Sequence, residues 1–167
     1  MHVPDPHAID ASGPAPLLRA LTVQSSVERV LTAWCDPAVQ AVLFAGAAEL
    51  VEIGTAASRW RLNAPLGQHP VVSLRSQRRS DVLVQQVIQG EDGELASTWL
   101  IARPCLHRDG VEVELRVRYA PDGLVERMLT RLLDPAPAVL AGQVLRRLRA
   151  WLESGEVPTL QSNPAAR

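Results

Sequence analysis

The sequence predicts an α+β domain in which a curved antiparallel sheet of about seven strands wraps around one long C-terminal helix, with two short helices after the first strand. Two observations predict this fold class. Ala138–Glu156 carries apolar residues at helical spacing along its whole length, so it has a wide apolar face. Between Leu50 and Tyr119, short strand-like segments alternate with turn residues, as in an antiparallel meander. The apolar face of the helix needs an equally broad apolar partner, and only these strands can provide it.

The composition is that of an ordinary soluble globular protein. The chain has 167 residues, enough for one domain with its own core, and 47% of them are hydrophobic. Its 17 basic and 18 acidic residues leave a net charge of −1, so no nucleic-acid partner is predicted. No apolar run is long enough to span a membrane, so stable membrane insertion is not expected. Cys35 and Cys105 predict neither a disulfide framework nor a zinc site, which favours a reducing, cytoplasmic location.

The first part of the chain predicts a tail, a strand and two short helices. Residues 1–16 are rich in proline and lack a periodic apolar pattern, so we expect a disordered tail there. Leu17–Val23 is typical of a strand. The helix that follows has Ser25 and Ser26 as suitable N-caps and apolar residues at helical spacing up to Trp34. We expect the second short helix within Ala38–Ala48.

The middle of the chain predicts a series of strands joined by turns that contain Gly, Pro or Asp. The last strand has the clearest pattern, because apolar residues alternate with Glu and Arg from Val111 to Tyr119. One of its faces is therefore expected to be buried and the other to face water, as in an antiparallel sheet that covers a core. The predicted strands in this part are 50–53, 58–64, 70–76, 82–89, 95–103 and 110–119.

Two amphipathic helices are predicted after the last strand. Leu124–Leu133 forms the first, and the second lies within Ala138–Glu156, where Gly155 can close the last turn. Residues 17–160 are thus expected to form a single domain, followed by a flexible tail over 161–167. In the second helix the predicted buried face holds Leu140, Ala141, Val144, Leu145, Leu148, Trp151 and Leu152, and the predicted exposed face holds Arg146, Arg149 and Glu153.

Several strings, in their order along the chain, resemble one protein superfamily. Leu145–Thr159 (LRRLRAWLESGEVPT) is similar to its C-terminal ending, and Val27–Asp36 (VERVLTAWCD) is similar to its first helix. Trp60 with Ala64–Gly67 resembles a W-x-x-x-x-P-x-G segment, and Gly110–Pro121 resembles its last strand. These strings resemble the SRPBCC superfamily of helix-grip (START/Bet v 1-like) proteins, in particular a bacterial branch related to polyketide cyclase/dehydrase and coenzyme Q-binding proteins.

This resemblance implies a hydrophobic cavity between the sheet and the C-terminal helix, in which the protein binds a lipid, polyketide or quinone. It implies no cofactor and no metal. Two alternatives stay open, namely an enzyme of the aromatase/cyclase type and a ligand-free partner protein whose own side chains fill the cavity. The sequence makes no prediction about oligomeric state. The ligand-binding residues that the resemblance implies are Trp60, Leu62, Trp99, Val113, Leu115, Val117, Tyr119, Met128, Val144 and Leu148.

The sequence predicts no catalytic residue. It contains no phosphate-binding glycine loop, no H-E-x-x-H and no G-x-S-x-G. An aromatase/cyclase would need more than one polar side chain inside the cavity to assist enolisation and dehydration. The candidates for such a role are His69, Gln85, Thr98 and Arg103.

Overall fold

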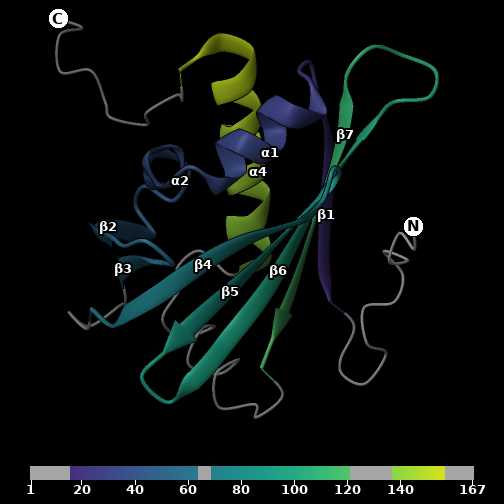
Figure 1. Cartoon of the computed structure of the whole chain (residues 1–167). Helices are drawn as coiled ribbons and strands as arrows, with labels where there is room; N and C mark the ends of the chain where they lie inside the picture. The colour runs from purple at the N-terminus through teal and green to yellow at the C-terminus, as the bar shows by residue number, and fades with distance from the viewer. Residues whose placement is uncertain (1–15, 64–68, 121–136, 157–167) are drawn as a thin grey trace, which may run out of the picture.

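The computed structural model describes residues 16–63, 69–120 and 137–156, and it confirms the predicted fold class (Figure 1). A seven-stranded antiparallel sheet, with the strand order β1-β7-β6-β5-β4-β3-β2, curves without closing. Its two edges are β1 (Leu17–Val23) and β2 (Ala48–Ile53). The strands between them are β3 (Ser58–Leu62), β4 (Val71–Ser80), β5 (Leu83–Gly90), β6 (Gly93–Pro104) and β7 (Val111–Tyr119).

Helices α1 (Val27–Cys35), α2 (Pro37–Leu43) and α4 (Pro137–Ser154) lie on the concave side of the sheet (Figure 1). The predicted cap of the first helix is confirmed, since the Ser26 hydroxyl accepts a hydrogen bond from the Arg29 backbone N–H at 3.2 Å. Asp36 ends α1 and caps α2, where its carboxylate accepts from the Ala38 N–H at 2.8 Å. Asp36 is thus the C-cap of α1 and the N-cap of α2, and it is the only residue between the two helices.

The core forms where α4 packs against the concave side of the sheet and against α1. The predicted orientation of α4 is confirmed, because Arg146, Arg149 and Glu153 are exposed. Burial of this apolar face supplies the main hydrophobic stabilisation of the contact. The buried residues of α4 are Ala141, Val144, Leu145, Leu148 and Leu152, and they share one core cluster with Val23, Val30, Leu31, Trp34, Leu100 and Val113.

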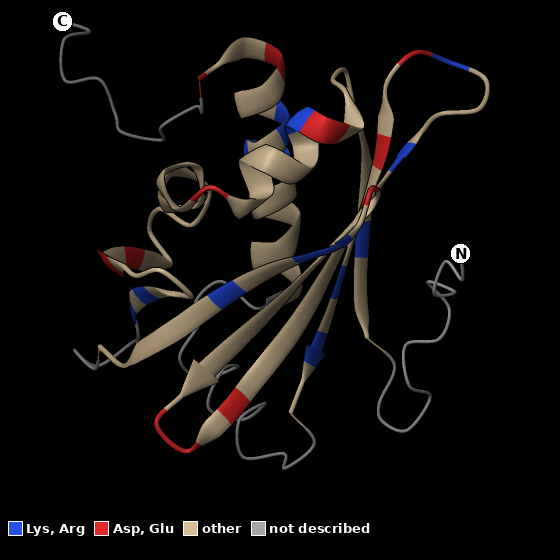
Figure 2. Ribbon diagram, viewed as in Figure 1, with Lys and Arg blue, Asp and Glu red and all other residues tan. Residues whose placement is uncertain are grey.

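The outer side of the sheet carries charged residues on β7, the strand for which the sequence predicted one face exposed to water. On β7, Val111, Val113 and Leu115 are buried on the concave side, while Glu112 on the opposite side is exposed. Glu114, on that outer side, pairs with the guanidinium of Arg116. Figure 2 shows residues of both signs spread over the strands and turns. The predicted buried face of this strand is confirmed, whereas on its charged face Glu112 is exposed and Glu114, Arg116 and Arg118 are half-buried.

The structure corrects several element boundaries, and among them β2 begins at Ala48 rather than at Leu50, β3 ends at Leu62, and β6 is longer at both ends than predicted. The second helix ends at Leu43 rather than continuing towards Ala48, where β2 begins. Arg147 of α4 holds this helix end, because its guanidinium donates to the carbonyls of Leu43 at 2.9 Å and Ala45 at 2.8 Å. Strand β4 runs on to Ser80 rather than ending at Ser76, so the turn before β5 is only residues 81–82. The predicted helix over residues 124–133 and both predicted tails fall wholly or largely outside the described residues.

Replacing Leu148 by Ala should lower the free energy of unfolding by about 2–5 kcal/mol, because a large side chain with no exposed surface leaves a cavity. The Arg149→Ala variant changes the next residue, which is exposed, and should change this free energy by no more than about 0.5 kcal/mol. Urea titration of both variants measures the difference. Equal losses in the two variants would contradict this assignment of the buried face.

Candidate functional site

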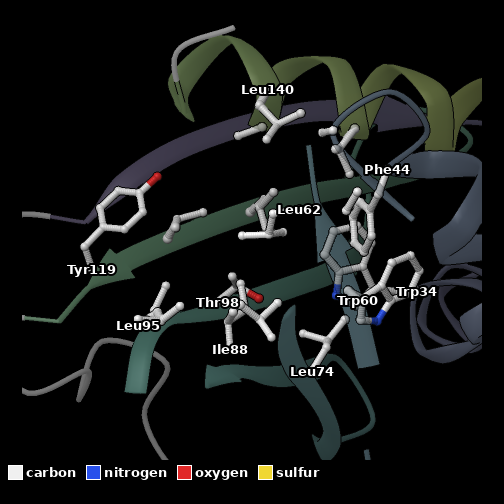
Figure 3. Close-up of a pocket in the computed structure, with 18 residues that line it drawn as sticks. Trp34, Phe44, Trp60, Leu62, Leu74, Ile88, Leu95, Thr98, Tyr119 and Leu140 are labelled. Carbon is white, nitrogen blue, oxygen red and sulfur yellow. The ribbon is translucent and has the colours of Figure 1, made fainter. Parts of the chain in front are cut away.

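A cavity of about 180 Å³ lies between α4 and the concave side of the sheet, and it is partly open to solvent (Figure 3). Figure 3 shows Leu140 on the α4 side of the cavity and Thr98 on the strand side. The walls are almost entirely apolar, and among the lining residues Thr98 and Tyr119 are the two with hydroxyl groups. The lining residues are Trp34, Phe44, Ala47, Ala48, Trp60, Leu62, Val72, Leu74, Ile88, Leu95, Ala96, Thr98, Leu115, Val117, Tyr119, Leu140, Ala141 and Val144.

The structure brings most of the sequence-predicted site residues together around this cavity. Val113 and Leu148 do not line it, because both are fully buried in the neighbouring core cluster. Met128 lies outside the described residues. The predicted residues that line the cavity are Trp60, Leu62, Leu115, Val117, Tyr119 and Val144.

Trp99 lies on the opposite side of the sheet, which corrects its predicted place in the cavity. Its neighbours Thr98 and Leu100 are on the concave side, and successive residues of a strand point to opposite faces. The Arg118 guanidinium carbon lies 5.7 Å from the centre of the Trp99 ring, a cation–π arrangement on the outer face. Trp99 therefore belongs to the outer surface of the protein.

Three aromatic side chains form one end of the cavity (Figure 3). The ring of Phe44 lies edge-on to two indoles, with ring centres 6.3 Å from Trp34 and 5.3 Å from Trp60. The Trp60 indole N–H donates to the Ser58 hydroxyl at 2.8 Å, so its polar atom is satisfied away from the cavity. These contacts make this end a rigid apolar wall.

A buried polar network lies behind the cavity and begins at the end of α1. The carbonyl of Trp34 lies in the last helical turn, where a carbonyl lacks its usual partner within the helix. The Gln40 side-chain amide donates to this oxygen at 2.6 Å, and the amide of Gln86 lies 3.5 Å from it. Gln86 also donates to the Ser76 hydroxyl at 2.9 Å. The Trp34 carbonyl therefore joins α1 to α2 and β5, and the Ser76 hydroxyl of β4 joins the network through the two glutamine side chains.

The network reaches the cavity through Thr98. The hydroxyl of Thr98 lies 3.3 Å from the side-chain oxygen of Gln86 and donates to it. Both residues are buried, Gln86 with 2% and Thr98 with 7% of its surface exposed. Thr98 is therefore a cavity-lining side chain whose polar atom is already held in a fixed orientation.

Of the four polar candidates from the sequence, only Thr98 lines the cavity. His69 and Arg103 are exposed, and Gln85 pairs with Trp99 on the outer side. Burial raises the pKa of the Cys35 thiol, which disfavours a reactive thiolate there. In residues 16–63, 69–120 and 137–156, no group of His, Cys, Asp and Glu could hold a metal ion, and no helix is long and apolar enough to cross a membrane.

Several lining residues were missed by the sequence analysis. Phe44 follows the end of α2 and carries no local pattern that would place it at a cavity. Val72 and Leu74 of β4 did carry a signal, because they alternate with polar residues along the strand. Ile88 of β5 lies opposite Leu74 and enters the cavity through this pairing. The strand register, which the sequence does not specify, determines this part of the wall.

Comparison with protein-family models and with curated proteins gives no match for this chain. Solved structures with the same fold include a protein of Deinococcus radiodurans with 17% identity and a TM-score of 0.61, covering 84% of this chain and 99% of that protein. A Chromobacterium violaceum protein has 17% identity and a TM-score of 0.62, with the same coverage of 84% and 99%. A Rhodobacter sphaeroides protein has 20% identity and a TM-score of 0.61, covering 86% and 97%. At these identities the likeness establishes the fold alone.

Replacing Gln86 by Leu should lower the free energy of unfolding by about 1–3 kcal/mol, because it removes a donor to the Trp34 carbonyl and the acceptor of the Thr98 hydroxyl. The matched control is Gln85→Leu, the preceding residue on the outer side, which should stay within about 0.5 kcal/mol. Chemical denaturation of both variants measures these changes. A larger loss in the Gln85 variant would show that the network contributes little to stability.

Proposed function

We propose that this protein binds a small hydrophobic molecule in the cavity between α4 and the sheet. The observation that carries this proposal is a partly open space of about 180 Å³ with almost entirely apolar walls. A buried apolar cavity of about 150 Å³ binds benzene. The enclosed part of a ligand is therefore expected to have roughly the size of one substituted aromatic ring or a short branched chain. The resemblance to SRPBCC proteins supports the same kind of ligand.

The energetics of the cavity also support a ligand. A void in a protein core costs about 24 cal/mol per Å³, so leaving this volume unfilled costs up to about 4 kcal/mol. Rigid side chains such as Trp34, Phe44 and Trp60 hold the walls apart, because their edge-to-face contacts prevent collapse at this end. A bound apolar molecule would restore the lost dispersion contacts.

The alternative of an aromatase/cyclase has less support from the described residues. Its chemistry needs more than one polar side chain beside the substrate; of the four candidates only Thr98 lines the cavity, and among the lining residues Tyr119 is the other one with a hydroxyl group. The Thr98 proton is already donated to Gln86. The alternative of a filled cavity is disfavoured by the open volume. A cytoplasmic location, with Cys35 and Cys105 as free thiols, belongs to this proposal as well.

Saturating propylbenzene should raise the melting temperature, since a ligand at about 100 times its Kd stabilises the native state by about 2.7 kcal/mol. The Ala141→Leu variant places extra volume at a buried, cavity-lining position and should abolish this shift. The control Ala150→Leu alters a half-buried residue of the same helix outside the cavity lining and should keep it. Differential scanning fluorimetry measures these shifts in melting temperature. The same measurement with fatty acids and quinones tests whether the cavity binds molecules larger than propylbenzene.

The absence of a shift with propylbenzene, fatty acids and quinones alike would contradict the proposed function and favour a partner protein. A shift that survives in the Ala141 variant would show that the compound binds elsewhere.

A further inference from the structure

Phe44, the first residue after α2, forms one end of the cavity together with two indoles (Figure 3). Its ring centre lies 5.3 Å from that of Trp60 and 6.3 Å from that of Trp34. Figure 3 shows Tyr119 at the opposite end of the cavity. A chain that fills the cavity towards the indoles must therefore meet the Phe44 ring.

Arg147 of α4 holds the backbone on both sides of Phe44. One terminal guanidinium nitrogen of Arg147 donates to the carbonyl of Leu43 at 2.9 Å and to the carbonyl of Ala45 at 2.8 Å. A guanidinium nitrogen of this kind carries two hydrogens, so it can make both bonds. Arg147 lies three residues after Val144, a lining residue, and it does not line the cavity itself. The helix that forms one wall of the cavity therefore also anchors its aromatic end.

The other backbone bonds of Phe44 are internal to its own segment of the chain. Its N–H donates to the Gln40 carbonyl at 2.8 Å, and its carbonyl accepts from the Ala48 N–H at 3.0 Å. These bonds give the turn its shape, but they do not fix its distance from α4. Among the described residues, Arg147 makes the hydrogen bonds that tie this turn to α4.

The exposure of the turn separates the position of Phe44 from the stability of the fold. Ala45 is exposed, so water can take the place of Arg147 at its carbonyl. Loss of the guanidinium should therefore release the turn from α4 without leaving an unpaired buried carbonyl at this residue. The main effect of Arg147 is then expected on the place of the Phe44 ring.

We infer that Arg147 limits the length of the ligand that the cavity accepts, because it holds Phe44 in place as the end wall. This inference rests on the proposed function and concerns the same cavity. Arg147 is a positioning residue, since it acts through Phe44. A short apolar chain ends before the ring, whereas a longer chain has to displace it.

Linear alcohols of increasing length test the inference by isothermal titration calorimetry. Each methylene group that becomes buried raises affinity about fourfold, whereas a methylene that cannot enter adds nothing. The quantity compared is the affinity for decanol divided by the affinity for hexanol. Phe44→Ala removes the end wall and should raise this ratio at least about fourfold, the effect of one further buried methylene.

Arg147→Met keeps an unbranched side chain without its donors and should raise the ratio in the same direction. The matched control is Arg146→Met, which changes the preceding, exposed residue and should leave the ratio unchanged. In the double variant of Phe44→Ala and Arg147→Met, the ratio should equal that of Phe44→Ala alone, because Arg147 acts through Phe44. A merely structural role would lower the melting temperature and leave the ratio unchanged.

Circular dichroism checks that each variant is folded. If Arg147→Met does not fold, Arg147→Lys is the milder change, because its nitrogen lies one atom closer to the backbone, and it should shift the ratio in the same direction. Phe44→Leu takes the place of Phe44→Ala in the same way.

The outcomes separate this inference from the proposed function. If neither propylbenzene nor any of the alcohols binds the unaltered protein, the proposed function fails and the inference with it. If propylbenzene binds but no alcohol does, or if either single variant leaves the ratio unchanged, the inference is overturned and the apolar site stands. If Arg147→Met raises the ratio by the same factor with and without the Phe44 ring, Arg147 acts by another route and the inference is wrong.

Discussion

The backbone carbonyl of Trp34 is the point on which the arrangement of helices and sheet depends. It is left without a helical partner because α1 ends at Cys35, and only Asp36 separates this end from Pro37, the first residue of α2. A buried, unpaired carbonyl would cost more than an ordinary hydrogen bond returns. Gln40 from α2 and Gln86 from β5 both turn their amides towards it. The hydrogen bonds to the Trp34 carbonyl thus hold α1 and α2 on the sheet, and through Gln86 they also extend to the cavity-lining Thr98.

The cavity exists because two apolar clusters share the concave side of one sheet without merging. The larger cluster joins α4 and α1 to the central strands, and the smaller one gathers around Trp60, Val72 and Leu74. Residues of both clusters line the cavity, which therefore lies along the boundary between them. Phe44 packs against both clusters and links them at one end of the cavity through its edge-to-face contacts with two indoles. A stable core and an open apolar space can therefore occur on the same face.

In the proposed function, a ligand is recognised mainly by its size and its apolar surface. The apolar walls supply affinity for any molecule of suitable size, since burial of apolar surface is not directional. The same network that orients Thr98 also ties α1, α2 and the sheet together.

The sequence by itself determined the elements whose residues repeat with a clear period. The buried face of α4, the two faces of β7 and the cap at Ser26 were all predicted, because periodicity and capping are local properties of the chain. Tertiary structure decided which side of β6 faces the cavity. From Ala96 to Ala102 this strand is buried or half-buried at every position, so its residues do not alternate between polar and apolar. Without that alternation a shift of one residue exchanges the two faces, and only pairing with β5 and β7 places Thr98 inside and Trp99 outside.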